Sequence, residues 1–192
     1  MSFNLEKELA TRADYEKKIL HVVIEISRGT SNKIEYRPEG YFELDRTLYH
    51  QMYYNFDYGF LPQTLEGDGD PIDVVLLTTH PVPMGCVVKS RIIGMIQTKD
   101  QDGEDMKLIC VPVEKIDPRR SHVNSYEDLN SHLQDVLLGF FKEYKKLEKG
   151  KKKERKGTKK ERKRNEKGKK EREIFSFLSF FFSLLSYFLL FF

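Results

Sequence analysis

Short runs of apolar residues, separated by polar turns, fill the first part of the chain. The runs are rich in β-branched residues, which is typical of β-strands, and Gly94 within one run indicates a bulge or tight bend. They comprise residues 19–26, the two arms of a hairpin within 32–46, and residues 73–79, 86–98 and 106–116. Strands this short and this closely spaced predict a small β-barrel or sandwich.

The apolar pattern changes to a helical period after residue 124. Apolar side chains then recur at spacings of three or four as far as residue 150, which places them on one face of a helix. They are Tyr126, Leu129, Leu133, Val136, Leu137, Phe140, Phe141, Tyr144 and Leu147. Ser125 and Asp128 resemble a capping box. We therefore expect one long amphipathic helix from Ser125, packed on the barrel, and a helix or mobile arm in the polar first 20 residues.

The folded pattern ends at residue 150. Residues 151–173 carry 14 basic and 5 acidic side chains and predict a solvated linker. Residues 174–192 contain 8 Phe, 5 Leu and 4 Ser, and a run of this length can span a bilayer. A mis-spliced or frame-slipped reading frame would give the same composition, so a tail anchor and a gene-model artefact both stay open. The expected organisation is a folded domain at 1–150, a linker at 151–173 and an apolar tail at 174–192.

Charge and cysteine usage narrow the function classes. The chain has a net charge of +3, but residues 1–150 hold 19 basic and 25 acidic side chains. This acidity argues against nucleic-acid binding and suits a protein that holds cations. Cys86 and Cys110 lie in apolar runs without a CxxC partner, so we expect buried free thiols in a reducing cytoplasm.

Carboxylates are concentrated in two loops that adjoin predicted strands. The loop "EGDGDPID" contains Asp68, Asp70 and Asp73. The loop "KDQDGEDMK" contains Asp100, Asp102, Glu104 and Asp105. Aspartates in such turns often bond only to their own backbone, but two acidic loops at strand ends could also meet at one mouth of the barrel. Carboxylates held together need counter-cations, and hard oxygen ligands select Mg²⁺, Mn²⁺ or Ca²⁺.

The spacing of the candidate ligand residues in the sequence narrows the choice of metal. An EF-hand counted from Asp68 would need Gly and Glu where Asp73 and Thr79 stand, and the five histidines lack zinc-site spacing. Aspartates from separate loops are the usual protein half of an Mg²⁺ site that water and phosphate complete. Candidate phosphate partners, each of which would also be ordinary on a solvated surface, are Lys33, Arg46, Lys89, Arg91, Lys107, Lys145, Tyr54, Tyr58 and Tyr144.

The segment "DGDPID" at residues 68–73 resembles a signature of the family I soluble inorganic pyrophosphatases. Other segments resemble the same family in order and spacing, namely "VVIEI", "KIEY", "ELDR", "YYNFDYGF", "GEDMK" and "FFKEYKKLEKGK". The resemblance covers about residues 20–151. It implies an α+β fold, a small closed five-stranded OB-like β-barrel with flanking α-helices. It also implies an enzyme that hydrolyses pyrophosphate to two orthophosphates with Mg²⁺.

The resemblance further implies a role for each site residue. Asp70 is expected to be the general base beside the attacking water. The expected metal ligands are Glu25, Asp68, Asp73, Asp100 and Asp105. The expected contacts to the two phosphoryl groups are Lys33, Arg46, Tyr58, Lys107, Tyr144 and Lys145.

The chain also departs from the family pattern. Asn55 and Asp57 stand where many relatives carry Pro and Asn, and after Lys151 the usual further segment and final helix do not follow. A catalytically impaired relative that only binds metal or phosphate is therefore the alternative function. The resemblance implies a homo-oligomer in the cytoplasm, with a hexamer as the expected assembly. Membrane association is expected only if the apolar tail is genuine.

Overall fold

The computed structural model describes residues 3–14, 16–49, 51–66, 69–99 and 104–144, without the side chains of residues 98, 99, 104 and 105. These residues belong to Met1–Lys145, the first of two units into which the chain divides. The predicted linker and apolar tail lie outside the described residues. Within the described ranges, no helix has the length and apolar character needed to cross a membrane.

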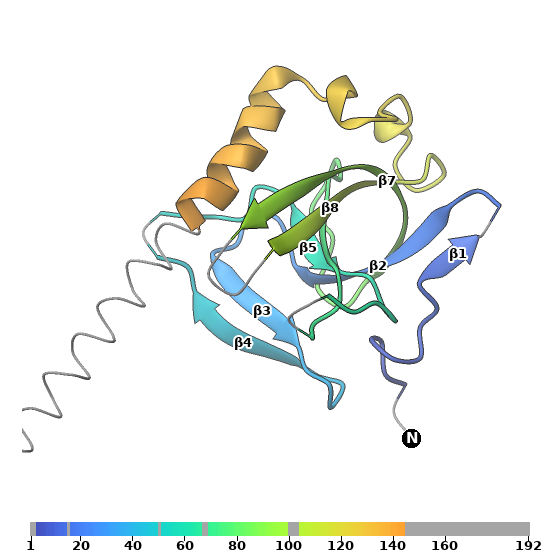
Figure 1. Ribbon diagram of the computed structural model, residues 1–192, viewed down its shortest axis with the longest axis vertical. Helices are drawn as coiled ribbons and strands as arrows, with labels where there is room; N and C mark the ends of the chain where they lie inside the picture. The colour runs from blue at the N-terminus through green and yellow to red at the C-terminus, as the bar shows by residue number, and fades with distance from the viewer. Residues whose placement is uncertain (1–2, 15, 50, 67–68, 100–103, 145–192) are drawn as a thin grey trace, which may run out of the picture. The chain divides into compact units, whose positions relative to one another are not determined.

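Five strands close into a barrel (Figure 1). They are β2 (Ile19–Ile26), β5 (Asp57–Phe60), β6 (Asp73–Leu76), β8 (Glu104–Pro112) and β7 (Val87–Lys99). The strands pair in the order β2-β5-β6-β8-β7, and β7 pairs again with β2 to close the ring. All of these pairs are antiparallel except β6 with β8, which is parallel. The closed five-stranded barrel confirms the predicted fold class.

Three further strands lie outside this ring. β1 (Arg12–Asp14) pairs with the start of β2, while β3 (Asn32–Tyr36) and β4 (Phe42–Thr47) form a separate two-stranded sheet. Gly40 in the turn between β3 and β4 has a φ of +95°, a conformation that suits glycine. The predicted hairpin is therefore confirmed. The expected N-terminal helix or mobile arm is wrong where β1 forms, because the three residues of β1 carry no strand pattern of their own.

The helical region is divided into two pieces. A 3₁₀ turn at Tyr126–Asp128 is followed by Leu129 in an extended conformation, and the α-helix then covers residues 131–144. The side chain of Asn130 accepts a hydrogen bond of 2.8 Å from the backbone N–H three residues later, which is an N-cap. The predicted helix is confirmed, but its predicted start at Ser125 is wrong, because the local cap there serves the 3₁₀ turn. The described ranges contain this one α-helix where flanking helices were expected.

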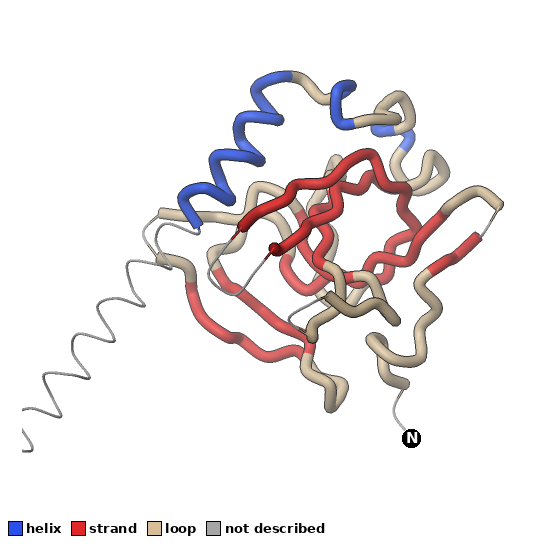
Figure 2. The backbone as a smooth tube through the Cα atoms, viewed as in Figure 1, coloured by secondary structure: helices blue, strands red, loops and turns tan. Residues whose placement is uncertain are grey.

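Two apolar clusters stabilise the barrel, one on each face of its sheet. Because alternate strand residues point to opposite faces, Val74 and Leu76 join one cluster and Val75 joins the other. The cluster that contains Val75 also contains Leu137 and Phe140 of the helix. This helix runs beside the ring of strands (Figure 2). The helix therefore completes the core on one face of the sheet.

The two cysteines differ in burial. Cys110 on β8 is buried, whereas Cys86, directly before β7, is exposed. The expectation of two buried thiols is therefore wrong for Cys86. An apolar run predicts burial only where its residues enter the sheet, and Cys86 precedes the strand.

Candidate active site

The parallel pairing of β6 and β8 brings the two acidic loops to one end of the sheet. Asp73, the first residue of β6, is paired with Lys107 of β8, so the segments that lead into both strands approach from the same side. The backbone N–H of Met106 donates to Glu66 Oε1 at 3.3 Å, which joins the two segments directly. The described parts of the two segments therefore lie next to each other, although they are far apart in the sequence.

Four of the predicted site residues are described only in part or not at all. Asp68, Asp100 and Lys145 lie outside the described residues, and Asp105 is described only by its backbone. That backbone places Asp105 in β8, two residues before Lys107.

Asp73 and Lys107 form the centre of the described site. Lys107 Nζ lies 2.5 Å from Asp73 Oδ2, and the lysine side chain is only 7% exposed. The same ammonium lies 5.7 Å from the centroid of the Tyr58 ring. Burial, then the charge of Asp73 and a hydrogen bond to it, raise the pKa of Tyr58 well above its ordinary value. Tyr58 therefore stays protonated at neutral pH and can donate a hydrogen bond.

Glu25 on β2 is a half-buried carboxyl group beside other acids. Its Oε1 accepts a hydrogen bond of 2.7 Å from the backbone N–H of Tyr36. Burial raises the pKa of Glu25 to about 8, and the charges of Asp73 and Glu35 also raise it, against the opposing effects of Tyr36 N–H and Lys33. The ionised form of Glu25 thus lacks sufficient positive charge nearby, which is the condition that a bound cation would relieve.

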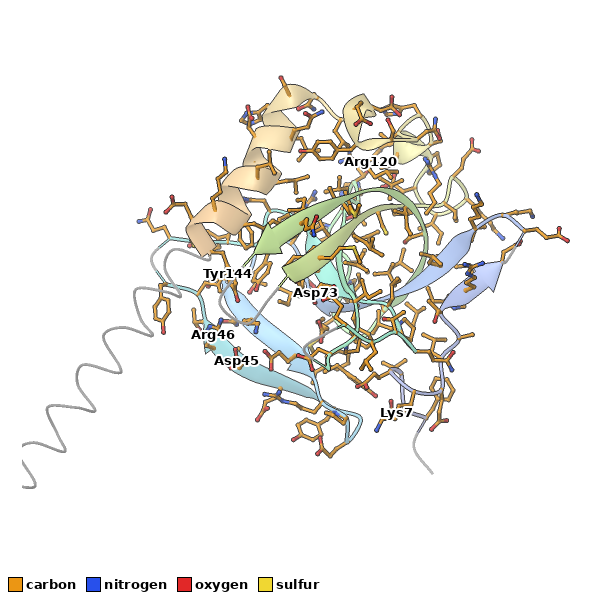
Figure 3. The ribbon with its side chains drawn as sticks, in the orientation of Figure 1. Lys7, Asp45, Arg46, Asp73, Arg120 and Tyr144 are labelled. Atoms are coloured by element: carbon orange, nitrogen blue, oxygen red, sulfur yellow. The ribbon has the colours of Figure 1, made fainter. Side chains whose placement is uncertain are left out.

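The hairpin supplies two cations that lie opposite each other. Lys33 on β3 is paired in register with Arg46 on β4. Lys33 Nζ lies 2.5 Å from Glu35 Oε1 and 3.6 Å from Asp45 Oδ2. Arg46 also pairs with Asp45, and its Nη2 donates to the hydroxyl of Tyr144 at 2.9 Å (Figure 3). The hairpin is thereby attached to the end of the 131–144 helix.

Sequence reasoning gave no role to Glu35 or Asp45, although both contact predicted phosphate-binding residues. The signal for Glu35 was its spacing from Lys33, because residues two apart on a strand share a face. Asp45 had no such signal, since its contact with Lys33 depends on the register of the hairpin.

Asp70 lies in the loop ahead of β6 and is exposed. Its backbone carbonyl accepts a hydrogen bond of 2.7 Å from the N–H of Glu66, so the loop is held across its base. The exposed position leaves Asp70 accessible to water.

Glu25, Asp73 and Lys33 belong to one electrostatic environment. The pKa of Glu25 responds to burial first, and then to Asp73 on β6 and to Lys33 on the hairpin, so these elements face a common site. No group of three or more His, Cys, Asp or Glu side chains placed to hold a metal occurs among the residues that the structure describes. Three of the five predicted ligands fall outside that search in whole or in side chain, namely Asp68, Asp100 and Asp105.

A family model described as inorganic pyrophosphatase matches residues 22–173. The chain belongs to the inorganic pyrophosphatase family. The match starts close to residue 20, where the sequence resemblance begins, and it extends past residue 151 into the basic segment.

Curated relatives and solved structures agree with this membership. The inorganic pyrophosphatase of Geobacillus stearothermophilus is 47% identical over 139 residues, which cover 72% of this chain and 82% of that protein. The inorganic pyrophosphatase of Sulfolobus acidocaldarius is 42% identical over 134 residues, 69% of this chain and 78% of the relative. The crystal structure of inorganic pyrophosphatase from Thermus thermophilus matches with a TM-score of 0.72 and 39% identity, over 78% of this chain and 84% of that one.

Proposed function

We propose that this inorganic pyrophosphatase family member hydrolyses pyrophosphate to two orthophosphates with Mg²⁺ as its cofactor. The observation that supports this most directly is the pairing of Asp73 with Lys107 at the end of two parallel strands. Hydrolysis of a phosphoanhydride needs carboxylates that bind divalent cations and ammonium or guanidinium groups that bind phosphoryl oxygens, and both must lie in one site.

The donor set fits a hard divalent cation. The proposed ligands are Glu25, Asp68, Asp73, Asp100 and Asp105, and all of them offer carboxylate oxygens. The raised pKa of Glu25, caused by burial and by neighbouring acids, supports a site that is short of positive charge. Divalent cations held there would lower the pKa of the attacking water and neutralise charge on the phosphates.

The proposed phosphoryl contacts come from five elements, namely β3, β4, β5, β8 and the 131–144 helix, and from Lys145. They are Lys33, Arg46, Tyr58, Lys107, Tyr144 and Lys145. The planar guanidinium of Arg46 can bind two oxygens at once, whereas Lys33 and Lys107 act as point charges. Tyr58 is protonated, since burial raises its pKa, and it can therefore donate to a phosphoryl oxygen.

Asp70 is the proposed general base. Its exposure on the loop before β6 supports contact with water, and a carboxylate can accept the proton that the attacking water loses. Expulsion of the second phosphate then depends on the cations around it, because charge develops on the leaving oxygen.

The test is phosphate release from pyrophosphate by the full chain, with and without Mg²⁺. Catalysed release that requires the metal is the expected result. The alternative, a relative that only binds metal or phosphate, would bind either ligand without releasing phosphate above the uncatalysed rate. The hexamer and the cytoplasmic location also stay predictions, which light scattering and cell fractionation can check.

A further inference from the structure

Asp73 and Lys107, which are proposed to bind different ligands, form an ion pair with each other. Asp73 is a proposed metal ligand and Lys107 a proposed phosphate ligand, yet Lys107 Nζ lies 2.5 Å from Asp73 Oδ2. The inference drawn from this pair rests on the proposed function and concerns how the two ligands affect each other.

Burial makes the pair strongly interdependent. The side chain of Lys107 is 7% exposed and that of Asp73 is 31% exposed. A buried ammonium group needs a nearby negative charge, because taking it out of water is costly. Asp73 supplies this charge, and the backbone register between β6 and β8 holds the two residues side by side.

A divalent cation at Asp73 would change this balance. The cation and the ammonium would compete for the same carboxylate, and two positive charges within a few ångströms repel each other strongly in a partly buried site. The ammonium would then lie beside a carboxylate already neutralised, and its attraction to Asp73 would be weaker.

We propose that Lys107 is the internal counterion of Asp73, and that a divalent cation at Asp73 displaces it and thereby makes it available to phosphate. Tyr58 allows this movement. Its ring faces the ammonium at 5.7 Å, so Lys107 can shift over the ring and keep a favourable cation–π contact. Metal binding and phosphate binding are then coupled through one side chain.

A purely structural ion pair predicts different results. If Lys107 served only to hold β6 and β8 together, its removal would loosen the site and weaken metal binding. If it is a counterion that a metal must displace, its removal strengthens metal binding, because the competing charge is gone.

The first experiment measures Mn²⁺ binding to the metal-free full chain, without substrate, by equilibrium dialysis. Lys107→Met should bind Mn²⁺ about tenfold more tightly or better than the wild type. Lys89→Met, which removes the same charge from an exposed position on β7, is the control and should change the affinity little. Equal or weaker Mn²⁺ binding by Lys107→Met would overturn the proposal.

The second experiment measures binding of inorganic phosphate in the absence of metal by isothermal titration calorimetry. Asp73→Asn keeps the shape of the side chain but removes the negative charge beside Lys107, so metal-free phosphate affinity should rise several-fold. Asp135→Asn, an exposed position on the helix, is the matched control. Unchanged or reduced phosphate affinity in Asp73→Asn contradicts the proposal, and this result stands even if Lys107→Met does not fold.

These outcomes are separable from those for the proposed function. If the wild type hydrolyses pyrophosphate but Lys107→Met binds Mn²⁺ no more tightly, the counterion exchange is wrong and the function stands. If both binding changes occur and no hydrolysis is found, the exchange stands and the catalytic function is wrong.

Discussion

Gly59 lies at a close approach of β5 to β2. A Cβ atom at this position would come within 1.8 Å of the carbonyl oxygen of Val23 and 2.8 Å of its carbonyl carbon. Both are backbone atoms of a paired strand, so they cannot move aside without breaking the pairing. The glycine is therefore required by the distance between two backbones.

Gly59→Ala should accordingly destabilise the fold by at least about 3 kcal/mol. Gly139→Ala is the control, because its Cβ would meet nothing within 4 Å and the residue lies in the helix. The control should gain up to about 1 kcal/mol from its higher helix propensity. Urea unfolding measures both, and a wild-type midpoint in Gly59→Ala would show that β5 can move away from β2.

Asp70 is the residue on which the proposed chemistry depends most. Asp70→Asn removes the proton acceptor but keeps the size of the side chain, so turnover should fall by about 100-fold or more. Metal binding should be kept in part, which Mn²⁺ dialysis can measure. Phosphate release is the assay, with Asp135→Asn as control, and undiminished turnover would exclude Asp70 as the general base.

In addition to the backbone pairing of β6 with β8, hydrogen bonds connect the segments that follow these two strands. Asp117, which follows β8, accepts hydrogen bonds from the backbone N–H of Thr79 at 2.7 Å and from its hydroxyl at 2.9 Å. Burial raises the pKa of Asp117, but the hydrogen bonds from Thr79 and from the backbone of Arg119, with the charge of Arg120, together leave the pKa below the ordinary value. The contact thus joins the segment after β6 to the segment after β8.

The lowered pKa gives this contact a definite pH dependence. A carboxyl group with a lower pKa in the folded state stabilises the fold above the unfolded-state pKa, near 3.9, and loses that effect as the pH falls through the folded value. Asp117→Asn should therefore be less stable than the wild type at pH 7, and the difference should shrink below about pH 4. Denaturant unfolding at both pH values tests this, and a pH-independent difference would contradict it.

At the scale of the whole molecule, the described core lies entirely before residue 145. The two apolar clusters draw their members from residues 20–144. Large apolar side chains are also exposed, among them Met95 at 61% and Ile92 at 46% on β7, and Leu138 at 40% on the helix.

We expect a copy ending at Gly150 to melt in one cooperative transition, because the described core would be complete in it. Mg²⁺ should raise the melting temperature if the folded state binds the metal, since the unfolded chain lacks the assembled site. Calorimetry of this copy beside the full chain is the measurement. Absence of a cooperative transition with and without Mg²⁺ would show that later residues are needed for folding.

Local sequence pattern was enough to predict β2, β6, β7 and β8, the hairpin, the helix and the two acidic loops, but neither β1 nor β5. These features follow from local patterns of apolar residues, turns and charge, which act over a few residues along the chain. The fold was needed to show that Asp73 pairs with Lys107, that Asp45 contacts both Lys33 and Arg46, and that the Cα of Gly59 lies against the backbone of β2. Each of these contacts depends on which strands become neighbours and in what register, and that choice is made by packing between segments far apart in the sequence.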